Sequence, residues 1–412
     1  MSDESILHLF EGYGIEIEYM IVDAETLNVR PITDELLRAV SGSFESEIEL
    51  GEIAWSNELA LHVVEFKTNG PSASLKGLGE TFQGHIVRAN ELLTRFDAHL
   101  LPSGMHPWMD AARDFRLWPH EHNAVYETFD RIFGCGGHGW VNVQSTHLNL
   151  PFGNDLEFGK LHAAIRLVMP LIPGLAASTP IVDGQLTGFS DTRLNYYATN
   201  SARVPSVTGL VIPEPIFSVA EYREGLLPRI YRDLEPHDPD GVLRHEWVNA
   251  RGSIARFDRM ALEIRIVDVQ ECPAADIAVA AAISAAVRWH VEEAWCGSRQ
   301  QRAWDQRELA AILKEAIKAG DEAVIDNRKL LDCFAYPEPG RASFGEVWQH
   351  IVETTLPAGE LSPGSRAALE VILEQGCLAR RITGAIEDDS LRNVYSRLAD
   401  CLNSGTPFEP PH

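Results

Sequence analysis

Apolar and polar side chains alternate along several short segments of the chain, and this alternation predicts β-strands. In residues 14–23, GIEIEYMIVD, isoleucine and tyrosine occupy one face of an extended strand, while Glu16 and Glu18 occupy the other. Methionine and valine follow the glutamates on their face, as in a strand that is covered on both sides. Comparable patterns predict three further strands, over residues 59–67, 140–150 and 260–269.

Helical spacing of apolar residues fills the segments between these strands. Apolar positions three and four residues apart predict helices over 73–100, 156–178 and 274–295. The second helix should kink or end at Pro170 and Pro173, because proline cannot donate the helical hydrogen bond. In the last quarter of the chain the strand pattern disappears, and helices are predicted over 302–319, 364–375 and 388–403.

The order of these elements predicts the class of fold. Strands and helices are mixed rather than arranged as repeated βαβ units, which is typical of an α+β fold. We expect a catalytic domain over residues 1–295 and a helical C-terminal extension over residues 296–412.

Composition and charge exclude several classes of partner. The chain has 60 acidic and 35 basic residues, a net charge of −25, so we expect no nucleic acid and no anionic membrane as partner. The longest apolar stretch, 278–287, is too short to span a bilayer, and the N-terminus predicts no secretory signal. Six cysteines without a C-x-x-C pair indicate reduced thiols in a cytoplasmic protein.

The two glutamates of the first strand require an explanation. Carboxylates roughly 7 Å apart repel each other by about 2 kcal/mol at an effective dielectric constant near 20. Either Glu16 and Glu18 lie in water at the end of an edge strand, or a divalent cation lies between them.

The other predicted strands carry ionisable side chains as well. Glu58 and Glu65 are seven residues apart, so both reach one site only if Glu58 precedes the strand or a bulge intervenes. His147 alone is typical of a hydrogen-bonded histidine in a sheet. Glu263 and Arg265 share one face, where an ordinary salt bridge is the simplest interpretation.

Taken together, these strands indicate a metal site. Burying the five glutamates in one sheet without a cation would be prohibitively costly. Oxygen ligands with a single imidazole favour Mg²⁺ or Mn²⁺ over zinc. Arg265 cannot lose its proton to bind a metal, but it is suited to clamp a phosphate. Metal ions, phosphate and arginine together predict nucleotide-dependent phosphoryl chemistry.

Four segments in this order resemble the type-2 glutamate–cysteine ligase family, within the glutamine synthetase superfamily. They are GIEIEYMIVD, ELALHVVEFKT, VNVQSTHLNLPF and ALEIRIVD, and the resemblance covers roughly residues 12 to 290. It implies a curved, largely antiparallel sheet with helices on its outer face, which holds Mg²⁺ and ATP. Matched position by position, it implies these metal ligands: Glu16, Glu18, Glu58, Glu65, His147 and Glu263.

The resemblance also implies roles for three arginines. Arg265 matches the arginine that steadies the transferred phosphoryl group and the nucleotide. Arg193 ends the loop STPIVDGQLTGFSDTR, where it would hold a substrate carboxylate or a phosphate unless it is a surface arginine. FDRIFG resembles a family segment that places Arg131 near the nucleotide.

One segment departs from the family pattern. Many relatives read something like G-L-H-V-H-V where this chain has CGGHGWVNVQSTHLN, with Asn142 and Gln144 in the predicted strand and His138 before it. The region near the acceptor substrate therefore differs, and glutamate plus cysteine is not implied as the substrate pair.

The resulting hypothesis is an ATP-dependent carboxylate–amine ligase that acts through an acyl-phosphate, with ATP and small carboxylate and amine substrates as partners. Two alternatives remain open: a metal-dependent phosphotransferase to a guanidino or other nitrogen acceptor, and a non-catalytic nucleotide or metal sensor. The sequence leaves the oligomeric state open, a homo-oligomer included.

Overall fold

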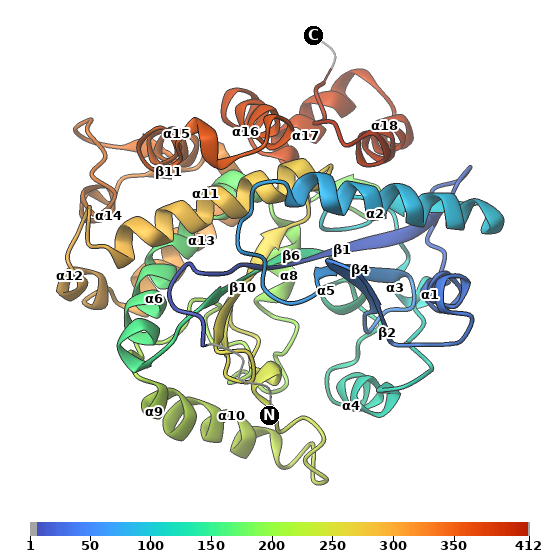
Figure 1. Ribbon diagram of the computed structural model, residues 1–412, viewed down its shortest axis with the longest axis horizontal. Coiled ribbons are helices and arrows are strands. Elements are labelled where there is room, and N and C mark those ends of the chain that lie inside the picture. Colours follow the sequence, from blue (N-terminus) through green and yellow to red (C-terminus); the bar gives the residue numbers. More distant parts are fainter. Residues whose placement is uncertain (1–5, 411–412) are drawn as a thin grey trace.

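A computed structural model describes residues 6–410, and an eight-stranded antiparallel sheet lies at its centre (Figure 1). The strands follow the order β2-β3-β4-β1-β6-β10-β9, and β5 pairs with the far end of β1. Their bounds are β1 (Gly14–Asp23), β2 (Glu47–Leu50), β3 (Ile53–Asn57), β4 (Val63–Thr68), β5 (Ala98–Leu101), β6 (Ser145–Pro151), β9 (Ser253–Arg256) and β10 (Ala261–Asp268). Two small hairpins are formed by β7 (Ile181–Val182) with β8 (Gln185–Leu186) and by β11 (Val324–Ile325) with β12 (Ala342–Ser343).

Helices surround this sheet. Those of the first half of the chain are α1 (Thr33–Ser41), α2 (Leu78–Leu93), α3 (Ala111–Asp114), α4 (Asn123–Phe133), α5 (His138–Val141), α6 (Asp155–Val168), α7 (Pro173–Ala176) and α8 (Thr192–Tyr197). Those of the second half are α9 (Val219–Glu221), α10 (Leu227–Leu234), α11 (Pro273–Val291), α12 (Ser298–Arg302), α13 (Gln306–Ala319), α14 (Arg328–Cys333), α15 (Phe344–Thr355), α16 (Pro363–Gln375), α17 (Leu378–Asp388) and α18 (Leu391–Ser404).

The two faces of β1 differ as the alternation predicts. Ile15, Ile17 and Tyr19 are fully buried in the main apolar core, together with side chains of α2 and α11. Figure 1 shows these two helices lying along one face of the sheet. Glu16 and Glu18 point to the opposite face, where they line a cavity. The prediction of an α+β fold with a largely antiparallel sheet is confirmed.

Helix α11 is the central helix of the covering layer. Its alanines let it pack closely, and it contacts α2, α6, α15 and α16. Pro273–Val291 is long and apolar enough to cross a membrane, but 78% of its most apolar window is buried inside the protein, as in a core helix.

Three boundaries differ from the prediction or refine it. β4 begins at Val63 rather than at residue 59. β6 begins at Ser145 rather than at residue 140, because residues 138–141 form α5 and residues 142–144 connect it to the strand. The predicted break at the two prolines is confirmed: α6 ends at Val168, Pro170 lies in a 3₁₀ turn and Pro173 begins α7.

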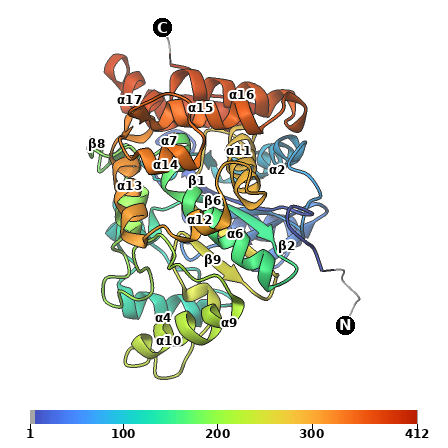
Figure 2. The same ribbon diagram turned by 90° about the vertical axis from the view of Figure 1, so that its left-hand side faces the viewer.

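The C-terminal part packs on the rest of the molecule. Figure 2 shows α15 and α16 stacked above α11 and α2. Trp304 and Trp348 belong to the same apolar core as Ile277 and Ile283 of α11. The expectation of helices alone is wrong in one detail, because the hairpin β11–β12 lies in this part. The domain boundary at residue 295 stays a prediction.

Candidate active site

A cavity of about 600 Å³ lies on the face of the sheet that carries the glutamates. Side chains of β1, β4, β6 and β10 form its floor. The connection between β3 and β4, together with α4, α5 and the turn between β9 and β10, forms its walls. All of the predicted metal ligands line it: Glu16, Glu18, Glu58, Glu65, His147 and Glu263.

The register of the sheet explains why residues so far apart in sequence converge. β1 lies between β4 and β6, so Glu18 is paired with Glu65 on one side and Glu16 with His147 on the other. Glu263 pairs with the residue two positions after His147 on β6, which projects to the same face. Directly paired residues of antiparallel strands lie on one face, and the four strands β4, β1, β6 and β10 therefore build one site.

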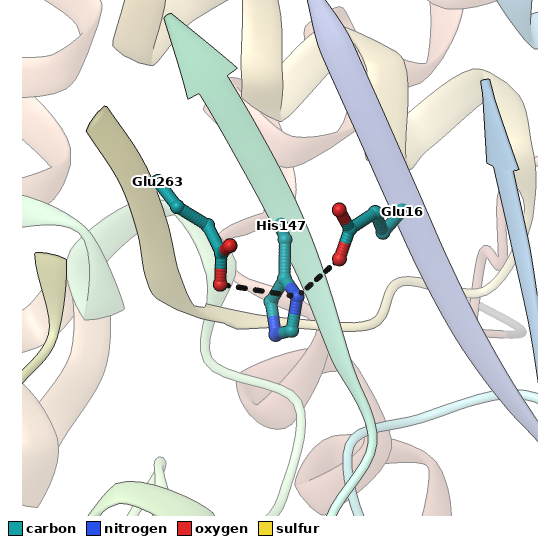
Figure 3. A group of neighbouring side chains, drawn as sticks. All are labelled: Glu16, His147 and Glu263. Carbon is teal, nitrogen blue, oxygen red and sulfur yellow. Dashed lines mark hydrogen bonds and ion pairs between the residues drawn. The ribbon is translucent and has the colours of Figure 1, made fainter. Parts of the chain in front are cut away.

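The first cluster consists of Glu16, His147 and Glu263 (Figure 3). His147 Nδ1 lies 3.0 Å from Glu16 Oε2 and 3.8 Å from Glu263 Oε1, and all three side chains are buried. One atom of each residue can be chosen so that all lie within 4.8 Å of one another, a spacing suited to a shared cation.

A second cluster, of Glu18, Glu65 and His147, meets the same criterion. Glu18 Oε2 accepts a hydrogen bond of 2.7 Å from the backbone N–H of Ser145, and Glu65 Oε2 accepts one of 2.6 Å from Ser56 Oγ. His147 belongs to both clusters, so the two candidate metal positions are adjacent.

Glu58 belongs to neither cluster, although it lines the cavity. It lies between β3 and β4, not on a strand, which is how it reaches the same side as Glu65. Burial, and then the nearby carboxylates of Glu18 and Glu65, raise the pKa of Glu58 well above its ordinary value.

The other titratable groups of the site show the same competition between burial and charge. Burial, followed by the carboxylate of Glu16, raises the pKa of Glu65 to about 7. Burial also acts to raise the pKa of Glu16, but the hydrogen bond with His147 and the charge of Arg259 outweigh it and lower that pKa. Burial acts to lower the pKa of His147, yet the neighbouring glutamates raise it.

Basic side chains stand directly beside these carboxylates. Arg265 Nε lies 2.9 Å from Glu263 Oε1, although the alignment does not satisfy a hydrogen bond, and Arg256 Nη1 donates one of 2.9 Å to Glu263 Oε2. Arg259 Nη1 donates a hydrogen bond of 2.9 Å to Glu16 Oε1. Lys67 Nζ lies 3.2 Å from Glu65 Oε2.

Three of these cations are absent from the expectation based on sequence: Lys67, Arg256 and Arg259. Lys67 carried a usable signal, since it lies two residues after Glu65 on the same strand face. Arg256 lies on the short strand β9, and Arg259 lies in the turn that connects β9 to β10. No local sequence pattern predicts that β9 pairs with β10.

The remaining predicted arginines occupy different places. Arg193 lines the cavity and is buried, with its Nε paired to Asp268, so it is not a surface arginine. Its Nη2 has no hydrogen-bond partner among residues 6–410. Arg131 is exposed on α4, donates a hydrogen bond to the His237 carbonyl and does not line the cavity.

The donor set fits a hard divalent cation. Carboxylate oxygens with a single imidazole nitrogen suit Mg²⁺ or Mn²⁺, which bind oxygen ligands in preference to sulfur. Buried donors without an acceptor in the described part of the chain, Arg193 Nη2, Arg256 Nε and Tyr197 Oη, also line this cavity and suit an anion beside the cation.

Comparison with known proteins agrees with this chemistry. The family model of glutamate–cysteine ligase family 2 matches residues 13–395. An uncharacterized protein of Archaeoglobus fulgidus is 41% identical over 68% of this chain and 75% of its own. A protein of Nocardioides sp., provisionally named glutamate–cysteine ligase 2-1, is 28% identical over 71% of both chains.

A solved structure shares the fold. The glutamate–cysteine ligase of Francisella tularensis in complex with AMP matches 97% of this chain and 89% of its own, with a TM-score of 0.62 and 12% identity. The sheet, the cavity with its carboxylates, and a family match that spans nearly the whole sequence lead to one assignment. The chain belongs to glutamate–cysteine ligase family 2, and with it to the ATP-dependent carboxylate–amine ligases.

Proposed function

We propose that this chain activates a small carboxylate with ATP as an acyl-phosphate and joins it to an amine, in the manner of a glutamate–cysteine ligase. The observation that carries the proposal is the juxtaposition, in one cavity, of two carboxylate–imidazole clusters with basic side chains. Such a set can neutralise a triphosphate from two sides, by bound cations and by guanidinium groups.

In this proposal Mg²⁺ or Mn²⁺ would be held by the first cluster, Glu16, His147 and Glu263, and by the second, Glu18, Glu65 and His147. Glu58 is a further candidate ligand. The bound ions would neutralise phosphate charge. Arg265, which faces the cavity beside Glu263, would hold the transferred phosphoryl group.

The proposed chemistry has two steps. A substrate carboxylate oxygen attacks the γ-phosphorus of ATP, forming an acyl-phosphate and releasing ADP. The amine nitrogen then attacks the acyl carbon, the C–O bond to phosphate breaks and the nitrogen loses a proton. Arg193 Nη2, which has no hydrogen-bond partner in the described part of the chain, is proposed to bind the substrate carboxylate or the phosphate. Arg131 has no part in the proposal, because it lies outside the cavity.

A trapping experiment tests the proposal. The protein is incubated with Mg-ATP, hydroxylamine and a panel of amino-acid and other small carboxylates. An acyl-phosphate reacts with hydroxylamine to give a hydroxamate, with one ADP and one phosphate released per product. ADP without free phosphate, together with a phosphorylated guanidine or amine, would identify a phosphotransferase. Nucleotide binding without any turnover would identify a sensor.

The proposal includes a cytoplasmic location and ATP, a carboxylate and an amine as partners. All six cysteines are free thiols and five of them are buried, which fits a reducing compartment.

A further inference from the structure

The lining of the cavity contains two chemically different groups of side chains, which are called its basic end and its apolar end. One end is basic, with Arg256, Arg259 and Arg265 on β9, β10 and the turn between them. The other end, here called the apolar end, is formed by Leu59, Val125, Tyr126, Phe129, Trp140 and Trp247. Its residues come from the β3–β4 connection, α4, α5 and the 3₁₀ turn Glu246–Val248.

The rings of the apolar end form a connected wall. The Phe129 centroid lies 5.5 Å from that of Trp140 and 5.9 Å from that of Trp247. Phe133 supports the wall from behind, 5.3 Å from Trp140 and nearly parallel to it. Phe129, Trp140 and Trp247 are only half-buried, so each presents apolar surface to the cavity.

We propose that the apolar end binds the body of the amine substrate, so that this chain ligates an amine carrying a large apolar or aromatic group. The inference rests on the proposed function and specifies its acceptor. A small polar amine would leave this surface in contact with water. An apolar amine would cover it, at roughly 25 cal/mol for each Å² removed from water.

Charge decides which substrate belongs at this end. ATP and the carboxylate substrate are anions, and the arginines of the basic end complement them. The apolar end contains no arginine, and within it the Tyr126 hydroxyl accepts a 3.0 Å hydrogen bond from Asn57. Aromatic faces attract a cation, and an amine arrives as an ammonium ion.

The test compares different amines as acceptors. The carboxylate substrate is held constant and is the one that gives most hydroxamate. Phenethylamine and isoamylamine are set against ethylamine and cysteine, and the amide product and phosphate are measured. We expect kcat/KM for the two apolar amines to exceed that for ethylamine by at least about tenfold. A preference for ethylamine or cysteine would overturn the inference.

Variants of the wall identify the ligand that it contacts. The measured quantity is the ratio of kcat/KM for phenethylamine to kcat/KM for hydroxylamine. In Phe129→Ala this ratio should fall at least about tenfold. Phe129→Leu keeps an apolar side chain, so the ratio should stay close to that of the unsubstituted protein. Phe44→Ala, which removes an exposed ring outside the cavity, should leave the ratio unchanged. If Phe129→Ala instead raises KM for ATP and leaves the ratio intact, the apolar end binds adenine and the inference is wrong.

The two proposals fail in distinguishable ways. Hydroxylamine is small enough to reach an acyl-phosphate without contacting the apolar end. Hydroxamate formation therefore reports the formation of the acyl-phosphate alone. Hydroxamate without preference for apolar amines would contradict only the inference. Absence of hydroxamate with every carboxylate, from protein that is folded as judged by a cooperative melting transition, would overturn both.

Discussion

Arg265 is the residue at which a catalytic and a structural interpretation can be separated. It pairs with Glu263 and also faces the cavity. Lysine keeps the charge but not the planar fork, so Arg265→Lys should fold normally, bind Mg-ATP and lose at least about a hundredfold in kcat. Arg131→Lys, the same change outside the cavity, is the control. A near-normal kcat with an altered melting temperature would return Arg265 to a structural role.

Glu16 and Glu263 should be required for turnover but not for folding. Glutamine keeps the shape of each side chain and removes the charge that a cation needs, so Glu16→Gln and Glu263→Gln should abolish Mg²⁺-dependent ADP formation. Glu91→Gln, on the exposed side of α2, is the matched control. Relief of carboxylate repulsion should not stabilise Glu16→Gln, because Arg259 and His147 already compensate that charge. Retained activity in both variants would contradict the metal sites.

Asp276 gives the stability of the protein a pH dependence. Burial is the main cause that raises its pKa from 3.8 to about 7, although it accepts a 2.7 Å hydrogen bond from Thr146 Oγ1. Between about pH 4 and pH 7 the folded state therefore binds more protons than the unfolded state. The free energy of unfolding should fall as the pH rises, by at most about 1.4 kcal/mol per pH unit from this group. Glu58 and Glu65, whose pKa values are also raised, add to this slope, so Asp276→Asn should reduce it in urea titrations without abolishing it. An unchanged slope in Asp276→Asn would contradict the role of Asp276.

At the residue level, five glutamates singled out from the sequence line the cavity, but only two of its four arginines were singled out, Arg193 and Arg265. The role of these residues as ligands stays a prediction. Strand alternation is a local property, and it correctly directed Glu16 and Glu18 to one face. The positions of Arg256 and Arg259 depend on how β9 pairs with β10 and on the turn between them. That geometry is set by tertiary packing, so short-range patterns did not reveal it.

Among the elements, long amphipathic or strongly alternating segments were predicted and short ones were missed. β1 matches its predicted bounds. α11 begins one residue before its predicted start at residue 274 and ends four residues before its predicted end at residue 295. β2, β5 and β9 have four residues each, and β5 was absorbed into a predicted helix over 73–100. Strands of this length are stabilised by their partners, here β3, β1 and β10, rather than by their own propensities.

Helix α17 is tied to the start of α11 by a buried ion pair. Arg381 Nη1 lies 2.5 Å from Glu271 Oε1 and donates a 2.6 Å hydrogen bond to the Phe408 carbonyl. Arg381→Leu should cost about 3–5 kcal/mol in urea unfolding, because it leaves a buried carboxylate unpaired. Adding Glu271→Leu should recover part of that loss.

A matched control comes from an exposed ion pair. Arg244→Leu breaks the 3.4 Å contact with Glu235 and should cost about 1 kcal/mol or less. Equal losses in Arg381→Leu and Arg244→Leu would show that the buried pair contributes nothing special to the docking of α17.

For the molecule as a whole, the C-terminal helices and the sheet should unfold together. One continuous core joins side chains of α11 with those of α13, α15 and α16. Urea titrations followed by far-UV circular dichroism and by tryptophan fluorescence should therefore give one coincident transition. Two separate transitions would instead support independent folding units on either side of residue 295.

The arginines beside the glutamates affect how a divalent cation and ATP would bind in the cavity. Arg256 and Arg259 each donate a 2.9 Å hydrogen bond to a carboxylate that a cation would also need. An arriving ion must therefore compete with them, and each guanidinium that it releases is free to meet a phosphate. Ion and nucleotide would assist each other's binding, so Glu16 and Glu263 would bind a divalent ion more weakly while ATP is scarce.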